Sequence, residues 1–373
     1  MSELERTEVT QTLEGEKTLD RKKPRYFQVD ALKAVAIALV VLDHSVTWDI
    51  KHAIYAPFWE RLSIPLFLII MGFNLGLSFR RREEQGHKGV FSTEYLNSRV
   101  TRYMFPFLIL YLTSTVAGLL FQQLEFNEYV FLCYLPFWGP GNWFIPLLFT
   151  SIVVLPPLYK AFTRWPVRTL VACFLSELAL QLIMYFFFPY PIDSAAEAYI
   201  VTAIRGNVLF FLPAIGLGLW FSRGHDLFER RNSFILALLP PSLVFLVAYQ
   251  FFRMKPAFIR GDYTLLFYPY AAFIFLVMMA ILPATAEGRG ASTIRKISSA
   301  TYHIFLFQIF YFSIVWHLWA GFLGIPTIEV GSVQVFLDLW LYIPYYLMNL
   351  TITFLGGLLW YELETRARLR RGF

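Results

Sequence analysis

A lysine and a histidine stand eleven residues apart in one apolar stretch of this chain, at Lys33 and His44. An α-helix makes about three turns plus 20° over that distance, so both side chains share one helix face roughly 16 Å apart. Asp30 falls near the same face, whereas Asp43 points away from it. Because an imidazole titrates near neutral pH, it can take a proton from a hydroxyl. The stripe is therefore suited to general base catalysis.

Each residue of the stripe also has a structural interpretation. Lys33 could reach back to lipid headgroups, and His44 could be a hydrogen-bonded packing residue. The shared register of the two, with Asp30 beside them, favours a functional stripe, because ionisable groups in apolar helices face a bundle interior or a wet cavity. Asp43 either tunes His44 or lies in a wet outer vestibule, and the vestibule is slightly favoured.

The composition indicates that the stripe belongs to a membrane protein. Hydrophobic residues make up 57% of the 373 residues and charged residues only 16%, against about 25% charged in soluble domains. The mean hydropathy is +0.53. The net charge of +6 does not indicate nucleic-acid binding, because the basic residues cluster in loops. Ten membrane spans are expected, at 29–48, 57–79, 104–122, 143–160, 166–188, 204–221, 233–252, 264–285, 297–320 and 334–360.

The loops between these spans alternate in positive charge. Lysines and arginines gather after the second, fourth, sixth and eighth spans, whereas 123–142, 189–203 and 321–333 contain none. Two loops on the uncharged side depart from the pattern, because they contain basic residues: Lys51, Arg61, Arg253, Lys255 and Arg260. The positive-inside rule still predicts an all-α, multi-pass helical bundle of the cell membrane with both termini cytoplasmic. Its expected parts are a mobile cytoplasmic tail (1–24), a transmembrane domain (25–361) and a basic cytoplasmic C-terminus (362–373).

Other polar residues within the spans are weaker candidates. Glu177 and Gln181 lie four apart in the fifth span and share a face, where they form either a site or a hydrogen bond to another helix. Gly216 and Gly218 predict close packing of the sixth span. The sequence contains no Cys/His spacing typical of a metal site and no phosphate-binding loop, so no metal is expected.

Five segments, taken in order, carry a family resemblance. The first, Arg25 to Ser45, contains a basic residue, ten residues and then His44, and the third is Arg99-Val100-Thr101-Arg102 followed by Pro106. The others are 63–76, with Met71 where serine is usual, 142–148, which includes Trp143, and 301–308, with Gln308 where histidine is common. Together they resemble the membrane acyltransferase-3 family over residues 25 to about 360.

The resemblance implies an enzyme that moves an acyl group, with acetyl favoured, from cytoplasmic acyl-CoA to a hydroxyl of a cell-envelope glycan or related acceptor. His44 is then the catalytic base or an acyl carrier, with Asp30 and Lys33 beside it. Lys33, Arg99 and Arg102 would bind the phosphates of acyl-CoA, although ordinary positive-inside charge also explains the arginines. The weaker substrate-binding candidates are Asp43, Trp143, Glu177 and Gln308.

A second class of function stays open alongside the enzyme. A proton-coupled transporter or flippase of a lipid-linked or anionic substrate would use His44 in a proton relay. The two halves of the chain show no matching interrupted spans, which are the usual mark of such transporters. The expected partners are the lipid bilayer and a glycan or lipid-linked sugar acceptor, without nucleic acid. The acyl chain, the acceptor and the oligomeric state stay open.

Overall fold

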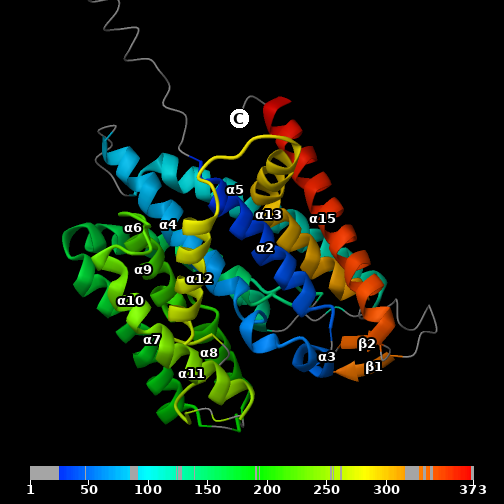
Figure 1. Cartoon of the computed structure of the whole chain (residues 1–373). Coiled ribbons are helices and arrows are strands. Elements are labelled where there is room, and N and C mark those ends of the chain that lie inside the picture. The colour runs from blue at the N-terminus through cyan, green and yellow to red at the C-terminus, as the bar shows by residue number, and fades with distance from the viewer. Residues whose placement is uncertain are drawn as a thin grey trace, which may run out of the picture.

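The chain folds into a bundle of helices, as shown by a computed structural model (Figure 1). It describes residues 25–370 apart from 47, 85–90, 123, 125–127, 138, 190, 193, 253, 255, 261–262, 316–326, 331–332 and 337–338. The predicted tail, 1–24, lies outside the described residues.

Helices dominate the order of elements. They are α2 (Phe27–Asp43), α3 (Trp48–Ala53), η1 (Ala56–Phe58), α4 (Ser63–Glu84), α5 (Thr93–Leu120), η2 (Glu128–Leu132), α6 (Phe144–Arg164), α7 (Pro166–Phe187), α8 (Ala195–Arg205), η3 (Val208–Phe211), α9 (Leu212–Phe221), η4 (Arg230–Asn232), α10 (Ser233–Ala237), α11 (Leu239–Gln250), α12 (Tyr268–Ile281), α13 (Arg289–Ile314) and α15 (Leu339–Arg370). Two short strands, β1 (Thr327–Val330) and β2 (Val333–Phe336), pair antiparallel. The predicted helical class is thus confirmed, with this one hairpin as the exception.

Several helices are suited to crossing a membrane. Within the described residues, seven are long and apolar enough, or eight if the pair α8 and η3–α9, bent by 50°, forms one span. Each of the ten predicted segments overlaps a helix, but α2 has 17 residues and α12 has 14, which is short for a span. The tenth predicted segment begins in β2, and its helix begins at Leu339. The count of ten spans therefore stays a prediction.

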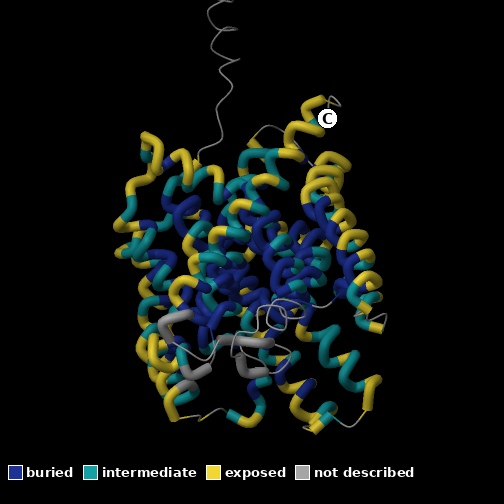
Figure 2. Tube along the Cα trace, turned by 90° about the vertical axis from the view of Figure 1, so that its right-hand side faces the viewer, coloured by how far each residue is buried: buried dark blue, intermediate teal, exposed yellow. Residues whose placement is uncertain are grey.

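Exposed residues lie on the outside of the bundle and buried residues concentrate at its centre (Figure 2). Many of the exposed residues are large and apolar. On α5, for example, Leu112, Leu119 and Leu120 are all more than half exposed. In water such a surface would be costly, whereas lipid tails accept it. The seven span-length helices and this outer surface together identify a membrane protein.

Glycines bring α4 and α9 together at the centre. A Cβ atom on Gly72 would lie 2.1 Å from the carbonyl oxygen of Ile215, and one on Gly218 would lie 2.0 Å from that of Ile69. Neither position can therefore hold a larger residue while the two backbones stay in contact. The close packing predicted for the sixth span is confirmed at Gly218.

Helix α2 runs through the bundle between α4 and α13, and α15 packs on the outer side of α13 (Figure 1). Helix α2 begins and α15 ends at the same end of the bundle, uppermost in Figure 1, which we call the termini end. The opposite end, which we call the far end, contains the turn after α2, α3 and the hairpin. Which side of the membrane each end faces stays a prediction.

Candidate functional site

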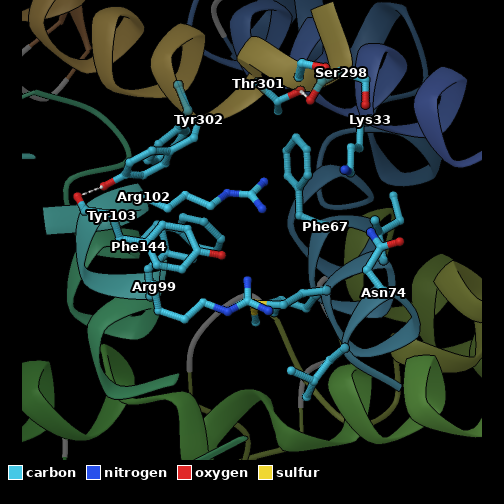
Figure 3. Close-up of a pocket in the computed structure, with 17 residues that line it drawn as sticks. Lys33, Phe67, Asn74, Arg99, Arg102, Tyr103, Phe144, Ser298, Thr301 and Tyr302 are labelled. Atoms are coloured by element: carbon cyan, nitrogen blue, oxygen red, sulfur yellow. Dashed lines mark hydrogen bonds between the residues drawn. The ribbon is translucent and has the colours of Figure 1, made fainter. Parts of the chain in front are cut away.

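A cavity opens among α2, α4, α5, α6 and α13, in the half of the bundle nearer the termini end. It encloses about 840 Å³ of space, including the part open to solvent. Three basic side chains point into it, namely Lys33 from α2 and Arg99 and Arg102 from α5 (Figure 3). We call it the basic cavity. The sequence predicted these three residues as one group, and the structure brings them together.

The start of α5 explains how its two arginines reach the cavity. The Ser92 hydroxyl accepts a hydrogen bond from the backbone N–H of Tyr95 at 3.1 Å, which caps the helix about two turns before Arg99. Arg102 lies three residues further on and therefore on a neighbouring face. Each guanidinium lies beside the ring of a tyrosine, Arg99 at 5.4 Å from the centre of the Tyr95 ring and Arg102 at 5.8 Å from that of Tyr103.

No carboxylate among the described residues forms an ion pair with Lys33, Arg99 or Arg102. Three cations that converge on one space without counter-ions repel each other, and an anionic ligand would relieve that repulsion. Arginine in particular matches phosphate oxygens with two parallel hydrogen bonds. The basic cavity is thus suited to a phosphorylated molecule.

The rest of the cavity lining is largely apolar and aromatic. Phe67 and Met71 come from α4, Phe144 from the start of α6, and Phe305 from α13. The rings of Phe144 and Phe305 contact edge to face, with centroids 5.3 Å apart. Met71 is the residue that replaces the usual serine of the second resembling segment, and it forms part of this wall. An uncharged chain attached to an anionic group that the basic residues bind would find an apolar environment here.

Asp30 is occupied by structural contacts. Its buried carboxylate accepts hydrogen bonds from Arg25 Nε at 2.6 Å and from Ser298 Oγ at 2.5 Å. These contacts fasten the beginning of α2 to α13 one turn before Lys33. The carboxylate does not line the basic cavity. It therefore orients Lys33 through the backbone of α2.

His44 lies at the other end of α2 from the basic cavity and does not line it. Its backbone angles are still helical (φ −89°, ψ −3°), so the eleven-residue register with Lys33 extends to it. The ring packs edge to face on Phe312, with centroids 6.0 Å apart, and the side chain is 22% exposed. The imidazole is accordingly partly accessible, about three helical turns from Lys33.

The turn that carries His44 is held by a buried amide. The Ser45 hydroxyl donates to the carbonyl of Val41 at 2.6 Å and accepts from Asn349 Nδ2 at 3.0 Å. Asn349, which is on α15, also accepts a hydrogen bond from the Tyr311 hydroxyl at 2.8 Å. Three helices thus fix the backbone next to the imidazole.

Asp43 belongs to an ion-pair network at the far end. Its carboxylate accepts from Lys51 Nζ at 2.6 Å, and Lys51 also contacts Glu60 Oε1 at 3.1 Å. Burial alone would lower the pKa of Lys51, but the carboxylates of Asp43 and Glu60 outweigh it and raise the pKa. The nearest oxygen of Asp43 is 4.0 Å from His44 Nδ1, beyond hydrogen-bond distance. Asp43 is thus chiefly a partner of Lys51.

The other predicted residues lie away from the basic cavity. The buried carboxylate of Glu177 accepts from the backbone N–H of Leu265 at 2.8 Å, and Gln181 Oε1 accepts from that of Arg260 at 2.6 Å. This pair therefore anchors the segment before α12. Gln308 is fully buried between Phe305 and Phe312 along α13, its Nε2 lies 3.5 Å from the carbonyl of Pro140, and its Oε1 has no partner among the described residues.

Trp143 lines a second cavity, which encloses about 760 Å³ including open space. Tyr134, Arg205, Phe211 and Tyr263 also line it. We call it the aromatic cavity. Trp143 precedes Phe144, which lines the basic cavity, and the two rings contact edge to face at 5.8 Å. Two residues that are neighbours in the chain thus line different cavities.

A buried cluster near the arginines was missed by sequence reasoning. His303 Nε2 lies 3.0 Å from Glu364 Oε2, Glu364 also contacts Arg368, and Arg368 donates to the carbonyl of Thr101 at 2.9 Å. The cluster ties α13 and α15 to the turn of α5 that carries Arg102. The spacing of Glu364 and Arg368, four residues apart, was the signal available in a segment interpreted only as a basic tail.

Comparison with known proteins identifies one family. A family model described as an acyltransferase domain matches residues 26–360. No curated protein and no solved structure matches the chain. The match includes the basic cavity, the whole of α2 and the aromatic cavity.

Proposed function

The chain belongs to the acyltransferase-3 family and is a membrane acyltransferase, and from that premise we propose that it transfers an acetyl group from cytoplasmic acetyl-CoA to a hydroxyl of a cell-envelope glycan. The observation that carries the proposal is the convergence of Lys33, Arg99 and Arg102 on one cavity beside α2, the helix that is followed directly by His44. In this proposal the termini end faces the cytoplasm and the protein resides in the cell membrane.

The donor would enter the basic cavity from the termini end. The phosphates of acyl-CoA are anionic, and the three cations of the basic cavity offer charge-assisted hydrogen bonds to them. The slender pantetheine arm would then extend along the apolar wall formed by Phe67, Met71 and Phe305 toward the interior. This arrangement supports a donor with a charged head and an uncharged arm.

His44 would act on the acceptor from the far end. Its imidazole takes the proton of an acceptor hydroxyl, and the oxygen attacks the thioester carbonyl carbon. The carbon–sulfur bond breaks, the CoA thiolate leaves, and the proton held by His44 neutralises it. In a two-step variant the imidazole nitrogen itself attacks first and carries the acetyl group to the hydroxyl.

Two residues would support these steps without taking part in them. Asp30 fixes the start of α2, and with it Lys33, by its contacts with Arg25 and Ser298. Gln308 lies on α13 between Phe305, which lines the basic cavity, and Phe312, which contacts His44. Its Oε1, which has no partner among the residues that the structure describes, is available to a group that passes between cavity and imidazole.

The test is turnover of radiolabelled acetyl-CoA by the purified protein in nanodiscs, with mass spectrometry of envelope glycans from cells with and without the gene. We expect release of free CoA that depends on added glycan, and loss of O-acetyl groups from the glycans of cells that lack the gene. Proton-coupled uptake of a sugar or anion by proteoliposomes, without any release of CoA, would instead identify the protein as a transporter and overturn the proposal.

A further inference from the structure

The aromatic cavity has the composition of a carbohydrate site. The ring of Trp143 is stacked on that of Phe211, with centroids 5.7 Å apart and planes at 21°. The ring of Tyr263 lies on the same tryptophan at 5.5 Å and 34°. Together with Tyr134 these rings give the cavity an extended aromatic lining. Aromatic faces of this kind accept the C–H-rich faces of sugar rings, which are apolar although the edges are polar.

Arg205 is the only charged residue among the described residues that line this cavity. It ends α8 at the 50° bend before η3, and its side chain is exposed. No carboxylate of the described residues forms an ion pair with it. A guanidinium without a counter-ion beside an aromatic surface favours a ligand that combines a ring with a negative charge.

Tyr134, which lines the same cavity as Arg205, is neutral. Burial raises the pKa of the Tyr134 phenol to about 12, although the charge of Arg205 opposes the shift. At neutral pH the phenol therefore donates and accepts hydrogen bonds without adding a charge. A sugar hydroxyl can bond to it, and an anion can approach Arg205 without repulsion from it.

The surrounding structure holds the cavity in shape. Glu177 and Gln181 bind the backbone of Leu265 and Arg260, on either side of Tyr263, and thereby fix the segment that carries this ring. Gly206 follows Arg205 in the cavity wall, where a Cβ atom would lie 3.2 Å from the carbonyl of Thr202 and 3.4 Å from Pro146. Glu177 and Gln181 of α7, which do not line the basic cavity, thus support the aromatic cavity.

From these observations we infer that the aromatic cavity is the acceptor site and that it binds an anionic sugar, with the ring on Trp143 and Tyr263 and the acidic group on Arg205. The inference rests on the proposed function, because it supplies the acceptor for the acetyl group. Trp143 lines this cavity and its chain neighbour Phe144 lines the basic cavity, and their rings are in contact, so an acceptor bound here would lie beside the donor cavity.

The test measures sugar binding to the purified full-length protein in phosphatidylcholine nanodiscs by saturation-transfer NMR, without an acyl donor. The probes are methyl glucuronoside and methyl glucoside, which differ only in the carboxylate. We expect the glucuronoside to bind about tenfold tighter or more, because charged hydrogen bonds distinguish the two. Arg205→Gln should remove this preference, whereas Tyr263→Leu should weaken both sugars.

Arg164→Gln is the matched control, because Arg164 is also an arginine at a helix end that lies beside a tryptophan, at 4.3 Å from the ring of Trp165. It should bind both sugars as the wild type does.

Equal binding of the two sugars by the wild type, or an unchanged preference in Arg205→Gln, would overturn the inference. Equal competition by glycerol 1-phosphate would overturn it as well, since that result identifies a lipid-headgroup site. This binding test contains no acyl donor and is independent of turnover. A failure to transfer acetyl groups in the turnover experiment would therefore contradict the proposed function and not this inference.

Discussion

Lys33, Arg99 and Arg102 converge on a cavity near the termini end, whereas Lys51 at the far end lies between two carboxylates, those of Asp43 and Glu60. Both groups are basic residues close to apolar helices, and in the sequence they look alike. The contacts separate them. The first group has no ion-pair partner among the described residues. Lys51, by contrast, forms ion pairs with two carboxylates of the protein itself.

The difference teaches how to assign these cations. A buried cation that is already paired contributes to stability and specificity, and removing one partner leaves an uncompensated charge. A set of unpaired cations around a cavity lowers the stability of the folded protein. Such a set is retained where a bound anionic ligand offsets the repulsion between the charges. We therefore expect variants of Lys51 to lose stability, and variants of the three basic-cavity residues to lose donor binding.

The largest effect on activity should come from His44, which lies between the two groups. His44→Ala should reduce acetyl transfer by about 10²–10⁴-fold if the imidazole is the general base, with donor affinity retained. His44→Gln should be equally inactive, because an amide cannot take a proton near neutral pH. Transfer and donor affinity would be measured on the same purified variants, with His52→Ala, an exposed histidine near the same end, as the control.

Near-wild-type transfer by His44→Ala would contradict the mechanism. Loss of donor affinity together with transfer would place the imidazole in the donor site instead.

The second effect concerns the paired cation at the far end. Lys51→Met should lower the free energy of unfolding by about 3 kcal/mol, because Asp43 and Glu60 are then left without their shared partner. Donor affinity should stay unchanged. Because the pKa of Lys51 is raised in the folded protein, this stabilisation is present at neutral pH and is lost as the pH rises through the raised value.

Thermal unfolding in detergent measures the change, with Lys296→Met as control, since Lys296 is exposed and 3.9 Å from Glu362. An unchanged unfolding temperature in Lys51→Met would contradict the claim that the ion pairs of Lys51 stabilise the fold.

The third effect should appear in donor binding. Arg99→Ala and Arg102→Ala should each weaken acetyl-CoA binding by about 1.5–3 kcal/mol, the usual value of a charged hydrogen bond. Desulfo-acetyl-CoA would give the affinity by calorimetry without turnover. Arg164→Ala should bind the donor normally. If both cavity variants kept wild-type affinity, the two arginines would be ordinary positive-inside residues.

Local patterns allowed part of this architecture to be predicted. The register of Lys33 and His44 depends only on helical geometry, and the helix through both is present in α2 and its final turn. The three-residue spacing of Arg99 and Arg102 placed them together for the same reason. Long apolar segments likewise predicted where helices lie, because length and hydropathy are properties of the segment itself.

Long-range contacts could not be predicted. Asp30 was interpreted as part of a catalytic stripe, but Ser298, which binds it, is 268 residues away in the sequence. Glu177 likewise contacts the backbone of Leu265, 88 residues away, and supports a cavity that no pattern in the sequence outlines. Pairing of His303 with Glu364 was missed for the same reason. These contacts depend on how the helices pack, which periodicity within one helix does not specify.

The smallest effect should be that of Lys33→Arg. The family pattern accepts either arginine or lysine with ten residues between it and the histidine, and a guanidinium keeps the positive charge in the cavity. It is bulkier than an ammonium, however, and Phe67 and Asn74 lie close to Lys33 in the cavity lining (Figure 3). We expect donor affinity to change by about threefold or less, since the charged contact survives. Lys33→Met, which removes the charge but keeps the stem, should lose about tenfold or more.

The split between KM and kcat decides what the charge does. If Lys33 only binds phosphate, Lys33→Met should raise KM for acetyl-CoA and leave kcat nearly unchanged. A large fall in kcat in Lys33→Met with normal KM would instead place the ammonium beside the reacting atoms. Lys33 would then join His44 in the chemistry, and the unpaired cations would no longer form a single binding group.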